Sequence, residues 1–93
     1  MLTAAEVVAL RFSSAGVFRA GYDADAVDDW LDRVILTLRA YEGDAEGSVE
    51  LLAEDAREAT LPTARGRDAY ATEDVDVAID RIASALSEHE RAA

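Results

Sequence analysis

Two segments of the chain share one spacing of apolar residues, and this constrains the fold more than any other feature. In both segments apolar residues recur at intervals of four and three, and the segments lie 48 residues apart. Heptad spacing of this kind places apolar side chains along one face of a helix. The sequence therefore predicts two helical seams that form an interface: Val27, Trp30, Leu31, Val34, Leu38 and Tyr41 in the first, and Val75, Ile79, Ile82 and Leu86 in the second.

The similarity of the two segments extends beyond their seams. The pattern Val-Asp-x-x-(Leu/Ile)-Asp-Arg-(Val/Ile) begins at Val27 and again at Val75, each time five residues after a tyrosine. Tyr22 and Tyr70 are expected to pack against the first turns of the helices that follow them. Self-similarity at a fixed offset indicates a repeated structural unit. We therefore predict a tandem duplication, with a first copy over residues 1–43, a linker over 44–50 and a degenerate second copy over 51–93.

Each copy is expected to contain a short helix, a loop and a longer helix. Thr3 and Glu6 form a capping box, and Gly43 is a helix stop. Serine, glycine and proline break the helical pattern in SSAGVFRAGY and TLPTARGRDAYAT, which we predict to be loops. An all-α fold follows, whose seams pair as a helical bundle, either in a coiled-coil-like homodimer or in an internal pseudo-dimer. The expected helices cover residues 4–11, 24–42, 49–59 and 73–90.

The composition excludes several classes of function. The net charge is −11, from 20 acidic residues and nine basic ones, all of them arginine. Such a chain repels phosphate backbones, so nucleic acid is not an expected partner. Without cysteine, neither a disulfide nor a thiolate metal site can form. No run is long and apolar enough to span a bilayer and no secretory signal opens the chain, so the expected location is the cytoplasm.

Residues typical of an active site are not grouped in the sequence. His89, the only histidine, continues the second seam, and no arrangement of a cysteine or serine with a base that would suggest nucleophilic catalysis accompanies it. The run DADAVDD is a poor match to a calcium-binding loop, because it lacks the glycine at the sixth position and lies in a predicted helix. We therefore predict a protein that is not an enzyme, with no cofactor and no metal site.

The residues around the first loop resemble a known family. A helix opened by Leu-Thr, then Phe-Arg in a glycine-containing loop, Gly-Tyr-Asp, and a Val-Asp-x-aromatic-Leu-Asp-x-Val phrase are similar to the N-terminal domain of the DivIVA family of bacterial cell-division and polar-growth scaffolds. The resemblance covers residues 2–42 well and residues 51–89 in decayed form. The matching residues are Leu2, Thr3, Phe12, Phe18, Arg19, Gly21, Tyr22, Asp23, Val27, Asp28, Trp30, Leu31, Asp32 and Val34.

The resemblance implies that the loop contacts a membrane. In DivIVA-like proteins an exposed phenylalanine and arginine touch the bilayer, so Phe18 would insert and Arg19 would meet lipid phosphate. The chain departs from the family pattern in four ways. The long C-terminal coiled coil is not seen in the sequence, and the domain is doubled. Ala20 is inserted before Gly21, and Gly66 stands where the second copy would carry the phenylalanine. Burying one phenylalanine contributes about 1.5–3 kcal/mol, and one arginine adds about 1 kcal/mol. A single chain should therefore bind a membrane weakly and need avidity.

Two functions stay open at this point. In one, the chain is a non-enzymatic DivIVA-like scaffold or adaptor, peripheral at the inner face of the cell membrane through Phe18 and Arg19. In the other, Phe18 folds inward over a seam, Arg19 is a solvated charge, and the chain is a soluble helical module that binds a protein partner without lipid. Because two wide seams leave apolar surface to cover, self-association as a homodimer or higher oligomer is expected in either case.

Overall fold

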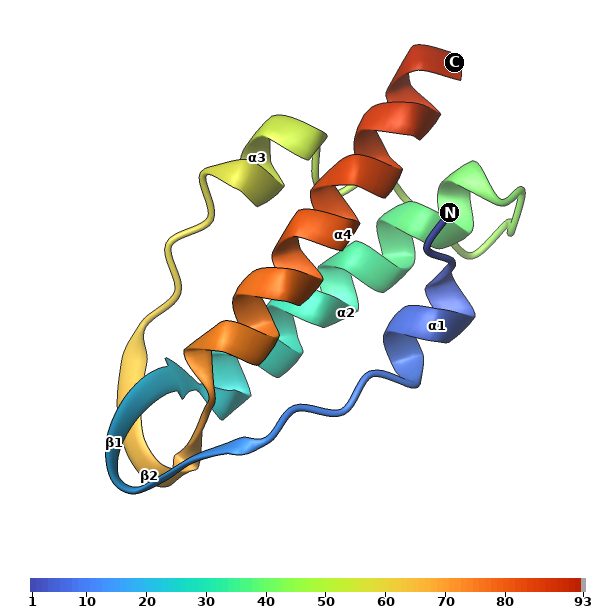
Figure 1. The fold of residues 1–93 in the computed structure, drawn as a ribbon. Coiled ribbons are helices and arrows are strands. Elements are labelled where there is room, and N and C mark those ends of the chain that lie inside the picture. The colour runs from blue at the N-terminus through green and yellow to red at the C-terminus, as the bar shows by residue number, and fades with distance from the viewer. Residues whose placement is uncertain (93) are drawn as a thin grey trace.

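The computed structural model describes residues 1–92, which form two long helices, a small sheet at one end and two short helices alongside (Figure 1). The order helix, strand, helix occurs twice along the chain. The molecule is elongated, with extents of 44 × 22 × 18 Å. In chain order the elements are α1 (Ala4–Val8), β1 (Ser14–Asp23), α2 (Ala24–Tyr41), α3 (Ala53–Arg57), β2 (Thr63–Tyr70) and α4 (Thr72–Ala92).

The all-α prediction is wrong, because both predicted loops are strands. β1 and β2 pair antiparallel and form a two-stranded sheet, so the protein combines helices with a small sheet rather than being a purely helical bundle. Neither segment shows the alternation of apolar and polar residues that marks a half-buried strand. Each strand finds its hydrogen-bonding partner in the other half of the chain, so no local pattern within either segment reveals the pairing.

The sheet is irregular because the register between β1 and β2 shifts three times along β1. Bulges separate the paired positions, which bends the strands around each other. Gly21 is buried at this crossing, and a Cβ atom there would lie 2.2 Å from the backbone oxygen of Tyr70, so only glycine fits. The register pairs Ser14 with Tyr70 and Gly16 with Gly66, and then Ala20 with Arg65, Gly21 with Ala64 and Tyr22 with Thr63. Tyr22 is also paired with Tyr70, and Asp23 with Ala69.

The helix ends follow local capping chemistry. The predicted capping box is present at α1, where the Thr3 hydroxyl accepts from the Glu6 amide at 3.2 Å and the Glu6 carboxylate accepts from the Thr3 amide at 3.0 Å. At the start of α2 the Asp23 carboxylate accepts from the Ala26 amide at 3.0 Å. Gly43 follows α2 with a φ of 86°, as expected of a helix stop. The short helices α1 and α3 cover fewer residues than predicted.

The two seams face each other in one core. The long helices lie side by side and run in the same direction away from the sheet (Figure 1). Trp30 and Leu31 are also buried, whereas Tyr41 and Ile79 are partly buried and pack against the same core. The seam residues that are at most 2% exposed are Val27, Val34, Leu38, Val75, Ile82 and Leu86.

Equivalent positions in the two halves make equivalent contacts. Tyr41 and His89 lie 48 residues apart and stack on each other, with ring centroids 4.8 Å apart and planes at 1°. This stack shows that α2 and α4 are in register. Glu42 accepts from the Ala4 amide at 2.9 Å, and Glu90 accepts from the Ala53 amide at 2.7 Å. A long helix in each half thus ends in a carboxylate that caps the short helix of its own half, a regularity that a tandem duplication would produce.

Candidate interaction site at the end of the sheet

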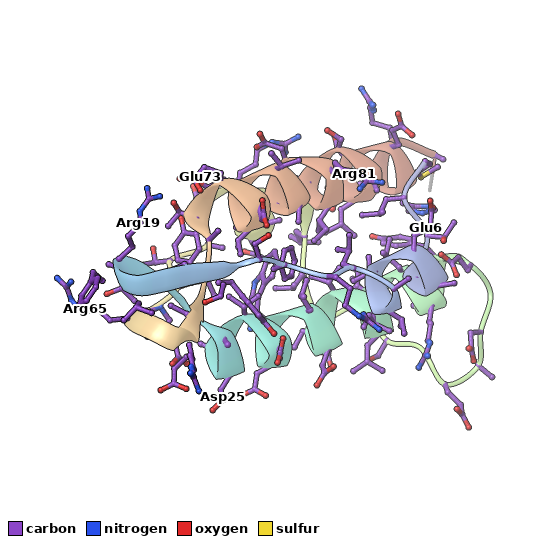
Figure 2. All side chains as sticks on the ribbon, turned by 60° about the horizontal axis from the view of Figure 1, so that its bottom comes forward. Glu6, Arg19, Asp25, Arg65, Glu73 and Arg81 are labelled. Carbon is purple, nitrogen blue, oxygen red and sulfur yellow. The ribbon has the colours of Figure 1, made fainter. Side chains whose placement is uncertain are left out.

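The outer end of the sheet presents an exposed aromatic side chain among arginines. Phe18 is 89% exposed and its neighbour Val17 is 75% exposed. The side chains of three arginines from both strands are exposed there as well. Figure 2 shows Arg19 and Arg65 projecting from the same end of the molecule, with Asp25 and Glu73 behind them at the starts of α2 and α4. We define the tip as Val17, Phe18, Arg19, Arg65 and Arg67.

The backbone of the two strands explains why these side chains project. Val17, Phe18 and Arg19 lie between the paired positions Gly16 and Ala20, where the register shifts. Gly16 has a φ of 104°, a left-handed conformation that glycine adopts at little cost. The strand therefore turns at this point, and the side chains of Val17, Phe18 and Arg19 point into solvent rather than packing against the helices.

The structure answers the question of where Phe18 lies. An inward-facing Phe18 would be buried against one of the seams, whereas the observed side chain is almost fully in solvent. Arg19 is exposed beside it. Phe18 and Arg19, the two contact residues predicted from the sequence, lie on one exposed turn. The pairing of the strands adds Arg65 and Arg67 of β2 to this end of the sheet, which the sequence alone did not predict.

Two tyrosine hydroxyls join each strand to the long helix of the other half. Tyr22 on β1 donates to Asp76 on α4 at 2.7 Å, and Tyr70 on β2 donates to Asp28 on α2 at 2.9 Å. Sequence reasoning expected both tyrosines to pack against their own helices and missed these bonds. The only signal available was the recurrence of tyrosine and aspartate six residues apart in both halves. The bonds fix the strands, and with them the tip, to the ends of both long helices.

These carboxylates change the acidity of the tyrosines. The hydrogen bond to Asp76, burial and the negative charge of Asp76 raise the pKa of Tyr22. Burial, followed by the hydrogen bond to Asp28 and its charge, raises the pKa of Tyr70. Each bond needs the protonated hydroxyl, so its contribution to stability is complete below the ordinary tyrosine pKa of about 10 and is lost as the pH rises through the higher pKa of the folded state.

We expect Asp28→Asn and Asp76→Asn to lower the pKa of Tyr70 and Tyr22, respectively, because each change removes a carboxylate acceptor and its charge. The ring signals of the tyrosines in NMR spectra, followed as the pH is raised, measure this shift. Asp29→Asn is the matched control, since it removes one exposed charge from the same turn of α2 without touching a tyrosine. Equal shifts in Asp28→Asn and Asp29→Asn would show that the bond does not set the pKa.

A groove between α1 and α2 is a concave surface on the side of the molecule. It has a volume of about 690 Å³. Its apolar wall includes Val8, Leu31 and Ile35, and its rim carries Arg11 and Arg39. Within residues 1–92 no cluster of three or more histidine, cysteine, aspartate or glutamate residues could hold a metal ion. None of the helices described is long and apolar enough to cross a membrane.

Comparisons of the chain with protein-family models, with curated proteins and with solved structures find no match.

Proposed function

We propose that the protein is a non-enzymatic scaffold or adaptor module, similar to the DivIVA N-terminal domain, for bacterial cell division or polar envelope growth. In this proposal Phe18 and Arg19 make a weak peripheral contact with the inner face of the cell membrane. The observation that carries the proposal is the 89% exposure of Phe18 at the end of an elongated molecule. A phenylalanine held in water by its backbone gains about 1.5–3 kcal/mol when it enters an apolar phase.

The charge distribution supports contact through the tip and not through the body. The net charge of −11 repels anionic lipid, and that repulsion falls off over about 8–10 Å at physiological salt. A projecting turn with Phe18 and Arg19 reaches the bilayer first, and the acidic residues farther along the two long helices are repelled less because they lie farther from it. The free energy available is comparable to that of a single lipid chain, which anchors only marginally. Stable attachment then requires several copies on one assembly.

The membrane contact is testable by vesicle co-sedimentation. We expect Phe18→Ala to lower the partition coefficient on anionic vesicles by about 10- to 100-fold, because the apolar burial is lost. Arg19→Glu should lower it by about thirtyfold, since the local charge changes by two. Leu52→Ala is a control that truncates another exposed apolar side chain, at the start of α3. If Phe18→Ala and Arg19→Glu sediment with vesicles as the wild type does, the membrane role is wrong.

The groove between α1 and α2 favours a second candidate function, a soluble module that binds a protein partner without lipid. Val8 is 52% exposed on its wall, where a partner side chain could cover it. The two functions respond to different variants. Val8→Glu would weaken a groove-bound partner and leave vesicle binding unchanged, whereas Phe18→Ala would do the reverse.

A further inference from the structure

We infer that β2 takes part in the same contact: Arg65 and Arg67 meet anionic lipid headgroups beside Phe18, so the tip is one asymmetric surface with its aromatic on β1 and most of its charge on β2. This inference rests on the proposed membrane function and goes beyond it, since it assigns a binding role to the second half of the chain. The sequence resemblance carries no such role, because the second half lacks the phenylalanine.

The register of the sheet places the arginines of β2 at the projecting turn of β1. Arg65 is paired with Ala20, the residue directly after Arg19. Gly66, between the two arginines of β2, is paired with Gly16 at the start of the turn. The labelled side chains of Arg19 and Arg65 lie at the same end of the molecule, where the strands extend beyond the long helices (Figure 2). The register therefore places Arg65 beside the turn that carries Phe18 and Arg19, and Arg67 lies two residues further along β2.

The local charge is opposite to that of the whole chain. Acidic residues outnumber basic ones by 20 to nine, yet residues 11–22 and 59–67 contain arginine and no acidic residue. Both stretches supply the turns that form the tip. Asp68 is exposed directly after Arg67, so three arginines against one carboxylate leave this end of the sheet with a local charge of +2. A positive patch of this kind matches an anionic surface, whereas the rest of the molecule is repelled by it. This complementarity identifies anionic phospholipid, and not a zwitterionic membrane, as the surface that the tip fits.

The conformation of Gly66 explains why β2 supplies charge without an aromatic. Gly66 has a φ of 70°, and a Cβ atom there would sit 3.7 Å from the backbone oxygen of Val17. There is space for a side chain, but the left-handed backbone strains any residue with a β-carbon, and a bulky aromatic most. The flanking positions bear no such constraint, so β2 can present long side chains only on either side of this glycine.

The test compares three double variants on vesicles of phosphatidylglycerol mixed with phosphatidylcholine, at low ionic strength. Arg65→Gln/Arg67→Gln should lower the partition coefficient by about thirtyfold, because each arginine near an anionic surface contributes about a factor of five. Arg33→Gln/Arg81→Gln removes the same charge from exposed positions on α2 and α4, and it should leave binding within about twofold of the wild type. Arg65→Lys/Arg67→Lys should bind like the wild type, since charge alone is required.

The outcomes separate this inference from the proposed function. If Phe18→Ala abolishes binding and Arg65→Gln/Arg67→Gln does not weaken it, the membrane function stands and the role of β2 is wrong. If Arg33→Gln/Arg81→Gln weakens binding as much as the tip variant, total charge governs binding and the role of β2 is again wrong. Equal wild-type binding to pure phosphatidylcholine vesicles would overturn the assignment of anionic lipid. Failure of the wild type to bind any vesicle would overturn both proposals.

Discussion

Replacement of Leu38 by alanine is expected to lower the free energy of unfolding by about 2–5 kcal/mol. Leu38 is 0% exposed and belongs to the core formed by the two seams. Truncation removes apolar contacts on both long helices and leaves a cavity that the opposite seam cannot fill. Domains of this size are stable by about 5–15 kcal/mol, so the loss is a large share of the total. Urea denaturation followed by circular dichroism measures it.

Leu36→Ala is the matched control for this experiment. Leu36 lies two residues earlier on the same helix and is only partly buried, so the same truncation should cost at most about 1 kcal/mol. Helix propensity changes equally in the two variants, which leaves burial as the difference. Equal losses at Leu36 and Leu38 would contradict the assignment of the first seam to the core.

Thr37→Val is expected to destabilise the protein by about 2–4 kcal/mol although valine has nearly the same shape. Thr37 is 0% exposed. Its hydroxyl donates to the carbonyl oxygen of Arg33 at 2.9 Å and accepts from the amides of Glu50 at 2.9 Å and Leu51 at 3.2 Å. Valine leaves both amides without this acceptor, and Leu51 is buried. This hydroxyl therefore ties the C-terminal part of α2 to the segment that leads into the second half.

Thr37→Ser keeps the hydroxyl and loses one methyl group, at a cost of about 1 kcal/mol. Hydrogen exchange of the Glu50 and Leu51 amides provides a local readout beside the unfolding free energy. Exchange should accelerate in Thr37→Val and stay close to the wild-type rate in Thr37→Ser. If Thr37→Ser and Thr37→Val had the same unfolding free energy and the same amide exchange rates, the hydroxyl oxygen of Thr37 would not be what fixes the Glu50–Leu51 segment.

The long helices could be predicted from the sequence because their information is local. The heptad spacing predicted helices over residues 24–42 and 73–90, and the helices observed in the structure cover Ala24–Tyr41 and Thr72–Ala92. The short helices were predicted too long, since their segments offer good start signals and only a brief apolar pattern. The strands were missed because an irregular, glycine-containing strand is defined by a partner that lies in the other half of the chain.

The site was predictable in its residue types and not in its geometry. Adjacent Phe18 and Arg19 in a glycine-containing segment indicated a contact, but the sequence left the aromatic free to face inward or outward. Its exposure depends on the turn that follows Gly16. The approach of Arg65 and the hydrogen bonds of Tyr22 and Tyr70 depend on the crossing of the strands, which only the assembled fold provides.

The crossed tyrosine bonds have a mechanical consequence. Tyr22 links β1 to α4, and Tyr70 links β2 to α2, so each strand is fastened to the helix that does not follow it in the chain. A pull on one strand is therefore transmitted along the backbone to one helix and through the tyrosine to the other. A force applied to the sheet therefore acts along the axes of both long helices at the same time. It cannot separate one long helix from the other unless a strand first detaches.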